Sequence, residues 1–110
     1  MAATSAPETI ALSGAAAVEF SSGLAAYTSG DYQLAARCFN AVVEARHDAA
    51  DAHCHLGLAY LKLNQLEDAK DSFLMAAHFG PAFAEAHYGL ALVAQRRGEH
   101  REASSELKQA

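Results

Sequence analysis

The segment AHCHLGLA at residues 52–59 decides the fold, because a similar segment, AHYGLALV, returns at residues 86–93. The two segments are 34 residues apart. Applied in both directions along the chain, the same offset relates three sets of residues: Gly23, Gly57 and Ala91; Ala35, Ala69 and Ala103; Phe39, Phe73 and Leu107. Self-similarity at a fixed period of this size is typical of stacked repeats, so the sequence predicts three similar units.

Small residues recur where two helices of one unit would cross. Antiparallel helices approach closely only where the crossing side chains are small. Gly57 supplies this on the first helix of the middle unit, and Ala69 supplies it on the second. Around that crossing, apolar residues recur at helical spacing and form one stripe: Leu56, Tyr60, Phe73 and Ala76. Each unit is therefore expected to be a hairpin of two helices.

Turn residues separate these helices at regular intervals. Gly30-Asp31, Asn64-Gln65 and Gly98-Glu99 fall inside the units. Gly or Asn takes the left-handed conformation that ends a helix, and Asp31 is expected to cap the start of the next helix. His47-Asp48 and Gly80-Pro81 are expected to end one unit and begin the next.

The middle unit resembles a complete tetratricopeptide repeat, because its signature positions are occupied by Leu56, Gly57, Tyr60, Ala69, Phe73, Ala76 and Pro81. The outer units depart from the pattern. Tyr27 lies one residue beyond the expected aromatic position, His47 replaces the proline, and Ala94 and Leu107 stand where the third unit would carry aromatic residues. The resemblance implies an all-α fold, a right-handed α-solenoid of three helix-turn-helix hairpins with a concave inner face.

The three units are expected at residues 16–49, 50–83 and 84–110. Residues 1–15 are expected to form an N-terminal tail or a short extra helix, with Pro7 near a helix start and Ser13-Gly14 as a break. The second helix of the third unit is unfinished, and no capping helix follows it. We interpret the chain as a piece of a larger protein, or alternatively as one that covers this end by self-association.

Composition and charge exclude several classes of protein. The net charge of −5 argues against a nucleic-acid partner, since nucleic-acid recognition requires a basic surface. The N-terminus has neither the basic nor the apolar region of a signal peptide, and no apolar run approaches the length that spans a membrane. Cys38 and Cys54 show no paired spacing, which favours a reducing compartment. We expect a cytoplasmic protein.

The resemblance implies that the first helix of each hairpin lines a concave groove. In this sequence the groove positions are Phe20, Leu24, Tyr27, Cys54, Leu58, Leu61, Lys62, Tyr88, Leu92, Gln95 and Arg96. Ala17, Asp51 and Glu85 lie at one edge, and Thr28, Lys62 and Arg96 lie at the other. The centre is apolar and aromatic, so the sequence predicts a binding surface for an apolar or amphipathic segment of another protein. The alternative is that these side chains pack one hairpin against the next.

The best-known ligand mode of the family is a clamp of Lys, Arg and Asn residues that grips the C-terminal carboxylate of chaperone tails. The interior positions here hold Phe20, Leu24, Cys54, Leu58 and Tyr88 instead. We therefore expect no such clamp. An amphipathic helix or an extended apolar segment fits these positions better.

Enzymatic and metal-binding functions have little support. The chain contains no nucleophile elbow, no phosphate-binding glycine loop and no recognisable pair of carboxylates. His53, Cys54 and His55 are adjacent, and adjacent residues on a helix point about 100° apart, so they cannot converge on one ion. His53 and His87 are interpreted as repeat-equivalent packing residues. We expect no catalysis, no cofactor and no metal.

Two further interpretations stay open. The run from Ser29 to Phe39, followed by Leu56-Gly57-Leu58, is similar to the three-repeat chaperones of bacterial type III secretion, which bind translocator segments in their groove. The second interpretation is a homo-oligomer formed through Leu107 and the uncapped third hairpin. The alanine-rich composition also resembles bacterial tetratricopeptide arrays that precede transferase domains, an analogy that places this chain in a larger bacterial protein.

Overall fold

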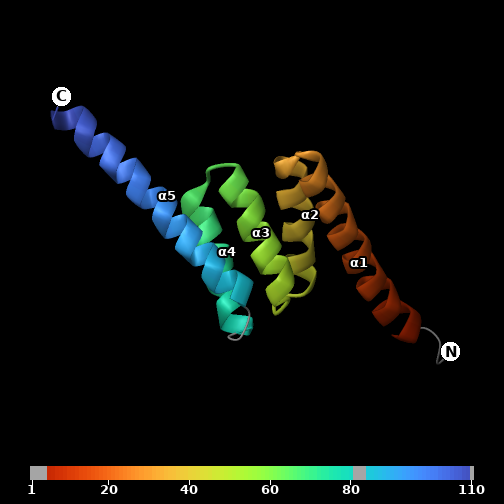
Figure 1. Cartoon of the computed structure of the whole chain (residues 1–110). Coiled ribbons are helices and arrows are strands. Elements are labelled where there is room, and N and C mark those ends of the chain that lie inside the picture. Colours follow the sequence, from red (N-terminus) through yellow and green to blue (C-terminus); the bar gives the residue numbers. More distant parts are fainter. Residues whose placement is uncertain (1–4, 81–83, 110) are drawn as a thin grey trace.

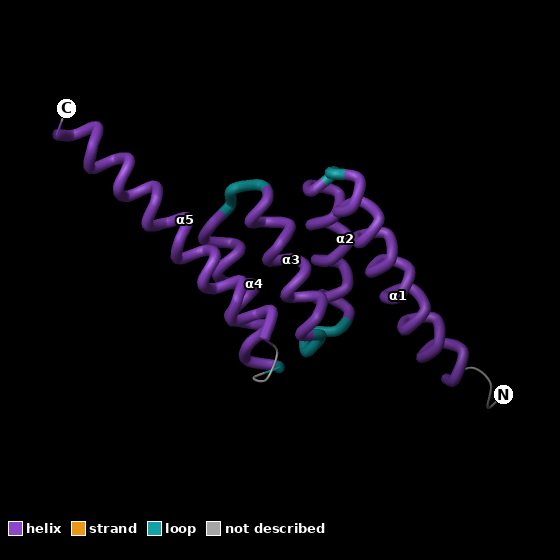
Figure 2. The backbone as a smooth tube through the Cα atoms, in the orientation of Figure 1, coloured by secondary structure: helices purple, strands orange, loops and turns teal. Residues whose placement is uncertain are grey.

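The computed structural model describes residues 5–80 and 84–109, and the side chains of residues 14–80 and 84–99. The backbone forms five helices: α1 (Ser5–Ser29), α2 (Tyr32–Ala45), α3 (Ala50–Lys62), α4 (Leu66–Phe79) and α5 (Ala84–Gln109). Each helix packs antiparallel to the next, so α1 with α2 and α3 with α4 form two hairpins, and α5 lies against α4 (Figures 1 and 2). The array is elongated, with extents of 73 × 29 × 17 Å. The described residues contain no strand, and the predicted all-α solenoid is confirmed.

The two turns inside the hairpins are copies of one another. Gly30 has a φ of 89° and Asn64 a φ of 61°, which is the left-handed conformation predicted for both positions. The amide of Gly30 donates to the carbonyl of Tyr27 at 3.1 Å, and the amide of Asn64 donates to that of Leu61 at 3.0 Å. The Asp31 carboxylate caps α2 by accepting from the Leu34 amide at 3.2 Å, as expected. The 34-residue period is therefore visible in individual hydrogen bonds.

The small residues at the crossings are required by the packing. A Cβ atom added to Gly23 would lie 2.7 Å from the Phe39 ring, and one added to Gly57 would lie 2.8 Å from the Phe73 ring. Both rings are fully buried, as are Ala35 and Ala69 on the second helices. Each hairpin is thus built around one phenylalanine that fills the space left by the glycine of the facing helix.

The turn predicted at Gly98-Glu99 is wrong. α5 continues through both residues, so the third unit contributes one helix to the array where the sequence predicted two. Gly98 does not take the left-handed conformation that ends α1 and α3. Among residues 99–109 only Ala103 and Leu107 are apolar, so a returning helix would bury too little apolar surface to offset the broken helical hydrogen bonds. The side chain of Leu107 lies outside the described residues.

Residues 5–15 extend the first helix and form neither a tail nor a separate helix. α1 begins at Ser5 and passes through Ser13 and Gly14 without a break. Pro7 is tolerated because it lies in the first turn, where its missing N–H has no intrahelical partner to lose. A glycine inside a helix costs only about 1 kcal/mol, which the continuous alanine-rich run around Gly14 outweighs. Residues 1–4 lie outside the described part of the chain.

Candidate peptide-binding face

The groove residues predicted from the sequence lie on α1, α3 and α5. These helices all run from the lower to the upper side of Figure 1 and are therefore parallel. α3 packs directly on α5, and Phe20 of α1 meets His55 of α3 with ring centroids 5.2 Å apart. We call the surface of this layer the groove face, and we define it by four predicted apolar residues that solvent reaches: Leu24, Leu58, Tyr88 and Leu92.

Tyr88 and Leu24 are the most exposed apolar side chains of the groove face. Tyr88 is 66% exposed and Leu24 is 37% exposed, whereas Leu58 and Leu92 are half-buried. Phe20 and Tyr27 are also half-buried, because they pack against the core of the first hairpin. Solvent thus reaches apolar side chains on all three parallel helices, which is a feature typical of interaction surfaces.

Cys54 and Leu61 do not belong to the open surface. They are 2% and 4% exposed and share a core cluster with Ala86 and Val93 of α5. α5 covers them because residues three and four positions apart on α3 form the ridge onto which the next parallel helix packs. The sequence placed them in the groove because the family resemblance assigns the same face of every first helix to it. Tyr88, the repeat equivalent of Cys54, does face solvent, since no helix follows α5 among the described residues.

One edge of the groove face is basic. Lys62 is exposed at the last turn of α3. Arg96 is half-buried, and its Nη1 donates to the main-chain carbonyl of Leu61 at 3.3 Å. This hydrogen bond places the Arg96 guanidinium at the end of α3, where Lys62 follows Leu61. Gln95 is exposed on the same turn of α5.

The opposite edge is acidic, as predicted. Asp51 and Glu85 lie in the first turns of α3 and α5, and both are exposed. Cys54, which is buried on α3, carries a titratable thiol. Burial raises the pKa of this thiol to about 11, and the charges of Glu85 and Asp51 act in the same direction. Because α3 and α5 are parallel, their first turns, and with them Asp51 and Glu85, lie on the same side of the layer.

Sequence reasoning missed His55 and Gly89, which occupy the same repeat position. The His55 ring lies 5.4 Å from the Phe39 ring, and its Nδ1 is 2.7 Å from the Asp51 carbonyl. At the next junction Gly89 takes this place, and a Cβ there would overlap the Phe73 ring. The signal available in the sequence was Gly89 itself, a second glycine close to the crossing position Ala91 of the third unit.

The histidines have separate structural roles. His53 is buried, stacks on Phe79 with ring centroids 5.8 Å apart, and has its Nε2 2.8 Å from the His47 carbonyl. The prediction that His53 is a packing residue is confirmed. His87, its repeat equivalent, is exposed and does not share this buried environment. Within the described part of the chain, no group of three or more His, Cys, Asp or Glu side chains is arranged to hold a metal ion.

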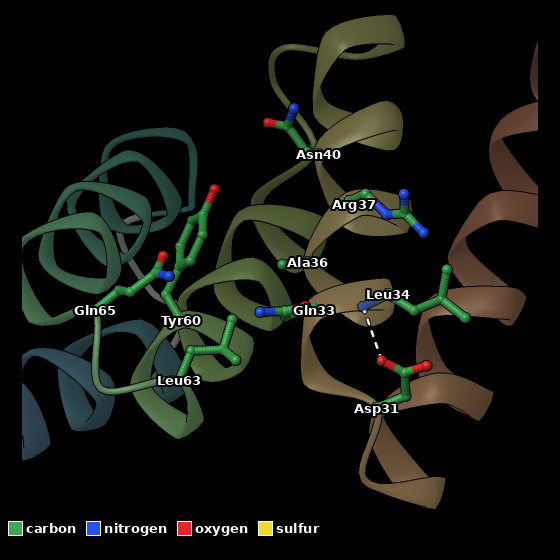
Figure 3. A pocket seen from close by; sticks show the side chains of 9 residues that line it. All are labelled: Asp31, Gln33, Leu34, Ala36, Arg37, Asn40, Tyr60, Leu63 and Gln65. Carbon is green, nitrogen blue, oxygen red and sulfur yellow. Dashed lines mark hydrogen bonds between the residues drawn. The ribbon is translucent and has the colours of Figure 1, made fainter.

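Two hollows lie beside the layers. One, of about 570 Å³, opens between α2 and the turn that joins α3 to α4, where Arg37, Asn40, Tyr60 and Gln65 surround it (Figure 3). The other, of about 500 Å³, opens at the start of α3 and is lined by Phe20, Arg46, Asp48 and Asp51, among others. The second hollow adjoins the acidic edge of the groove face through Asp51. Across the described residues, no helix has both the length and the apolar content that crossing a membrane requires.

Comparison with known proteins identifies the class. The tetratricopeptide repeat family profile matches residues 20–82, and the chain belongs to this family. A curated relative is the type IV pilus assembly protein PilF of Pseudomonas aeruginosa, which is 38% identical over 65 residues. That match covers 59% of this chain but only 26% of PilF, so the chain spans about a quarter of that relative.

Solved structures of the same fold cover most of the chain. The second tetratricopeptide domain of Spaghetti (RPAP3), bound to the HSP90 peptide SRMEEVD, matches with a TM-score of 0.74 and 21% identity over 86% of this chain and 87% of that one. A mutant form of MamA matches with a TM-score of 0.70 and 28% identity over 84% of this chain and 68% of that one. These similarities confirm the tetratricopeptide architecture, a fold that serves as a scaffold for protein interactions.

Proposed function

We propose that this protein binds an apolar or amphipathic segment of another polypeptide on its groove face, and that the module itself is not catalytic. The observation that carries this proposal is the row of solvent-accessible apolar side chains on parallel helices, from Leu24 on α1 through Leu58 on α3 to Tyr88 on α5. Aromatic and leucine side chains that are exposed on a rigid layer provide anchoring area for a partner.

A protein partner also agrees with the structural relatives. The domain of Spaghetti (RPAP3) was solved with an HSP90 peptide bound. That peptide ends in acidic residues, and the carboxylate clamp expected for such tails needs Lys, Arg and Asn at positions where this chain has Phe20, Leu24, Leu58 and Tyr88. We therefore propose a different ligand class on a shared scaffold, in which apolar contacts dominate.

The bacterial setting and the placement in a longer polypeptide are part of the proposal. Both are supported by the 38% identity with PilF, of which this chain spans 26%. A cytoplasmic location and the similarity to type III secretion chaperones stay predictions from the sequence. Co-expression with a type III translocator tests the second: a soluble complex supports it, and an aggregated translocator without a complex contradicts it.

The test of the binding face uses an electrically neutral helical peptide with leucine at positions i, i+3, i+4 and i+7 and glutamine elsewhere. We expect Tyr88→Glu and Leu24→Glu each to weaken its binding by about tenfold, measured by fluorescence anisotropy, because a buried carboxylate would oppose the apolar contact. Leu58→Glu is less informative, because Leu58 is half-buried and contacts the core between α3 and α5.

The matched control is Leu74→Glu. Leu74 is 47% exposed on α4, outside the layer that forms the groove face. The Leu74→Glu substitution should leave peptide binding unchanged. Equal weakening by all three variants, or by Leu74→Glu alone, would show that the groove face is not the binding surface.

Self-association is a second candidate, because Tyr88 leaves an aromatic side chain 66% exposed on the last described helix. Light scattering over a concentration series distinguishes the two candidates. A growing mass that Tyr88→Glu abolishes would favour a homo-oligomer, and a constant monomer mass excludes it.

A further inference from the structure

The groove face carries opposite charges at its two edges where the parallel helices α3 and α5 lie side by side. Acidic side chains are favoured in the first turn of a helix and basic side chains in the last turn, where they complement the helix dipole. When α3 and α5 run in the same direction, their first turns lie on one side of the layer, and the last turn of α3 lies on the other side, beside the middle of the longer helix α5 (Figure 1). Asp51 and Glu85 therefore share one edge, and Lys62 at the end of α3 lies on the opposite edge.

The charges at both edges are in position to meet a partner. Asp51, Glu85 and Lys62 are exposed, and Arg96 is half-buried. In the described ranges 14–80 and 84–99, the ion pair present joins Arg97 to Glu67 at 2.8 Å and uses none of these four side chains. Each edge combines one residue from α3 with one from α5. Arg96 of α5 reaches the main-chain carbonyl of Leu61 on α3, which precedes Lys62 in the sequence.

The distance between the two edges suits a helix. Asp51 and Lys62 are eleven residues apart on α3, so at 1.5 Å per residue the edges are separated by ~16 Å. A helix with its side chains is about 10–12 Å wide. One helix that lies across α3 and α5 therefore leaves a few ångströms on each flank, which Lys or Glu side chains can span. An extended segment points its side chains to two opposite faces only, so it cannot place apolar side chains on the layer and charged side chains at both edges at once.

We propose that the preferred partner of the groove face is an amphipathic helix with an apolar stripe, basic side chains on the flank that meets Asp51 and Glu85, and acidic side chains on the flank that meets Lys62 and Arg96. This inference depends on the proposed function. It adds a charge pattern to the ligand and a direction to its chain, because reversing the helix would exchange its two flanks.

The experiment uses three helical peptides of about 18 residues, long enough at 1.5 Å per residue to cross the three helices of the layer. All three share the leucine stripe. The first has lysine on one flank and glutamate on the other, the second has lysine on both flanks, and the third has glutamate on both flanks. We expect the mixed peptide to bind about tenfold more tightly than either of the others at low ionic strength, and the advantage to shrink as salt screens the charges.

A variant of the protein tests whether the acidic edge is responsible. In Asp51→Lys/Glu85→Lys both edges are basic, so the peptide with glutamate on both flanks should become the tightest ligand. Asp51 also accepts a hydrogen bond from the Ala52 amide at 2.9 Å, so this variant is checked for its melting temperature. Asp51→Asn/Glu85→Gln is the milder alternative, and it should reduce the preference for the mixed peptide over the glutamate peptide.

The matched control is Glu44→Lys/Asp71→Lys, which changes the net charge by the same amount on α2 and α4, outside the groove face. It should keep the order of the three peptides unchanged. The same reordering in this control, or tightest binding of the lysine peptide to the unmodified protein, would mean that overall charge selects the ligand and would overturn the inference.

Equal binding of all three peptides would also overturn the inferred charge pattern, while leaving the proposed binding face intact. Loss of binding by every peptide, including the neutral one, removes the proposed function itself.

Discussion

At the scale of single residues, the junction between the second and third units depends on glycine. Phe73 lies between Gly57 on α3 and Gly89 on α5, and neither position leaves room for a Cβ atom. At the preceding junction a ring takes the equivalent place, because His55 lies against Phe39. The two junctions of the array therefore have different chemistry at the same repeat position.

Gly89→Ala is expected to destabilise the protein by about 1–3 kcal/mol, because the new methyl group would overlap the buried Phe73 ring. The free energy of unfolding in urea measures the effect. Gly98→Ala is the control on the same helix, where nothing lies within 4 Å of an added Cβ. It should stabilise α5 by about 0.5–1 kcal/mol. A destabilising Gly98→Ala would instead support the left-handed turn that the sequence predicted there.

The Cys54 thiol makes the free energy of unfolding depend on pH in the alkaline range. Its pKa is about 11 in the folded protein and 9.0 in the reference state. As the pH rises, the unfolded chain therefore loses the thiol proton before the folded protein does. The contribution of the thiol to the free energy of unfolding is fully present below about pH 9 and is lost as the pH rises towards 11. Cys54→Ala should flatten the decline of unfolding free energy over this range. Cys38, Tyr27 and Tyr60, whose pKa values are also raised, remain in both proteins and set the residual slope. An unchanged slope would contradict the assignment.

At the scale of helices, capping differs between equivalent hairpins. Asp31 accepts a hydrogen bond at the start of α2, whereas Gln65, its counterpart at the start of α4, makes no side-chain cap. The two turns otherwise have the same left-handed residue and the same main-chain hydrogen bonds. The turn is thus specified by Gly30 and Asn64, and the cap is a separate contribution to stability.

Gln65→Asp should stabilise the protein by about 0.5–1 kcal/mol, because it transfers the Asp31 cap to α4 and adds a negative charge at a helix N-terminus. The reciprocal change, Asp31→Gln, should destabilise by a similar amount. Thermal and urea unfolding of both single variants and of the swapped double variant measure these effects. A neutral Gln65→Asp would mean that the start of α4 is already satisfied in another way.

At the scale of the whole molecule, each unit contacts only its neighbours. The hydrophobic core is divided into two clusters, one centred on Phe39 between the first hairpin and α3, the other on Phe73 between the second hairpin and α5. Tyr60 packs against both clusters. Stability in such an array is approximately a sum of unit and junction contributions, so a defect at one end need not reach the other.

Phe73→Leu tests this division. It leaves a gap between α3, α4 and α5, and we expect a loss of about 1–2 kcal/mol. Hydrogen exchange measured by mass spectrometry should show faster exchange in α4 and the described part of α5, with α1 and α2 keeping most of their protection. Uniform loss of protection across all five helices would show that the array unfolds as one cooperative unit.

The sequence by itself determined what repeats with the 34-residue period: the hairpins of the first two units, the crossing residues Gly23 and Gly57, and the left-handed turns at Gly30 and Asn64. These features follow from local conformation and from contacts inside one hairpin, which a short segment specifies. It also located the charged edges, since Asp51 and Glu85 on one side and Lys62 and Arg96 on the other are each 34 residues apart.

Only the tertiary structure decided which groove positions face solvent. Cys54 and Tyr88 are equivalent in the repeat, yet the first is 2% exposed and the second is 66% exposed. The difference arises because exposure depends on whether a following helix covers the position, and periodicity carries no information about that neighbour. The course of α5 also depends on tertiary contacts: the helix continues through Gly98 because a helix returning from a turn there would bury too little apolar surface.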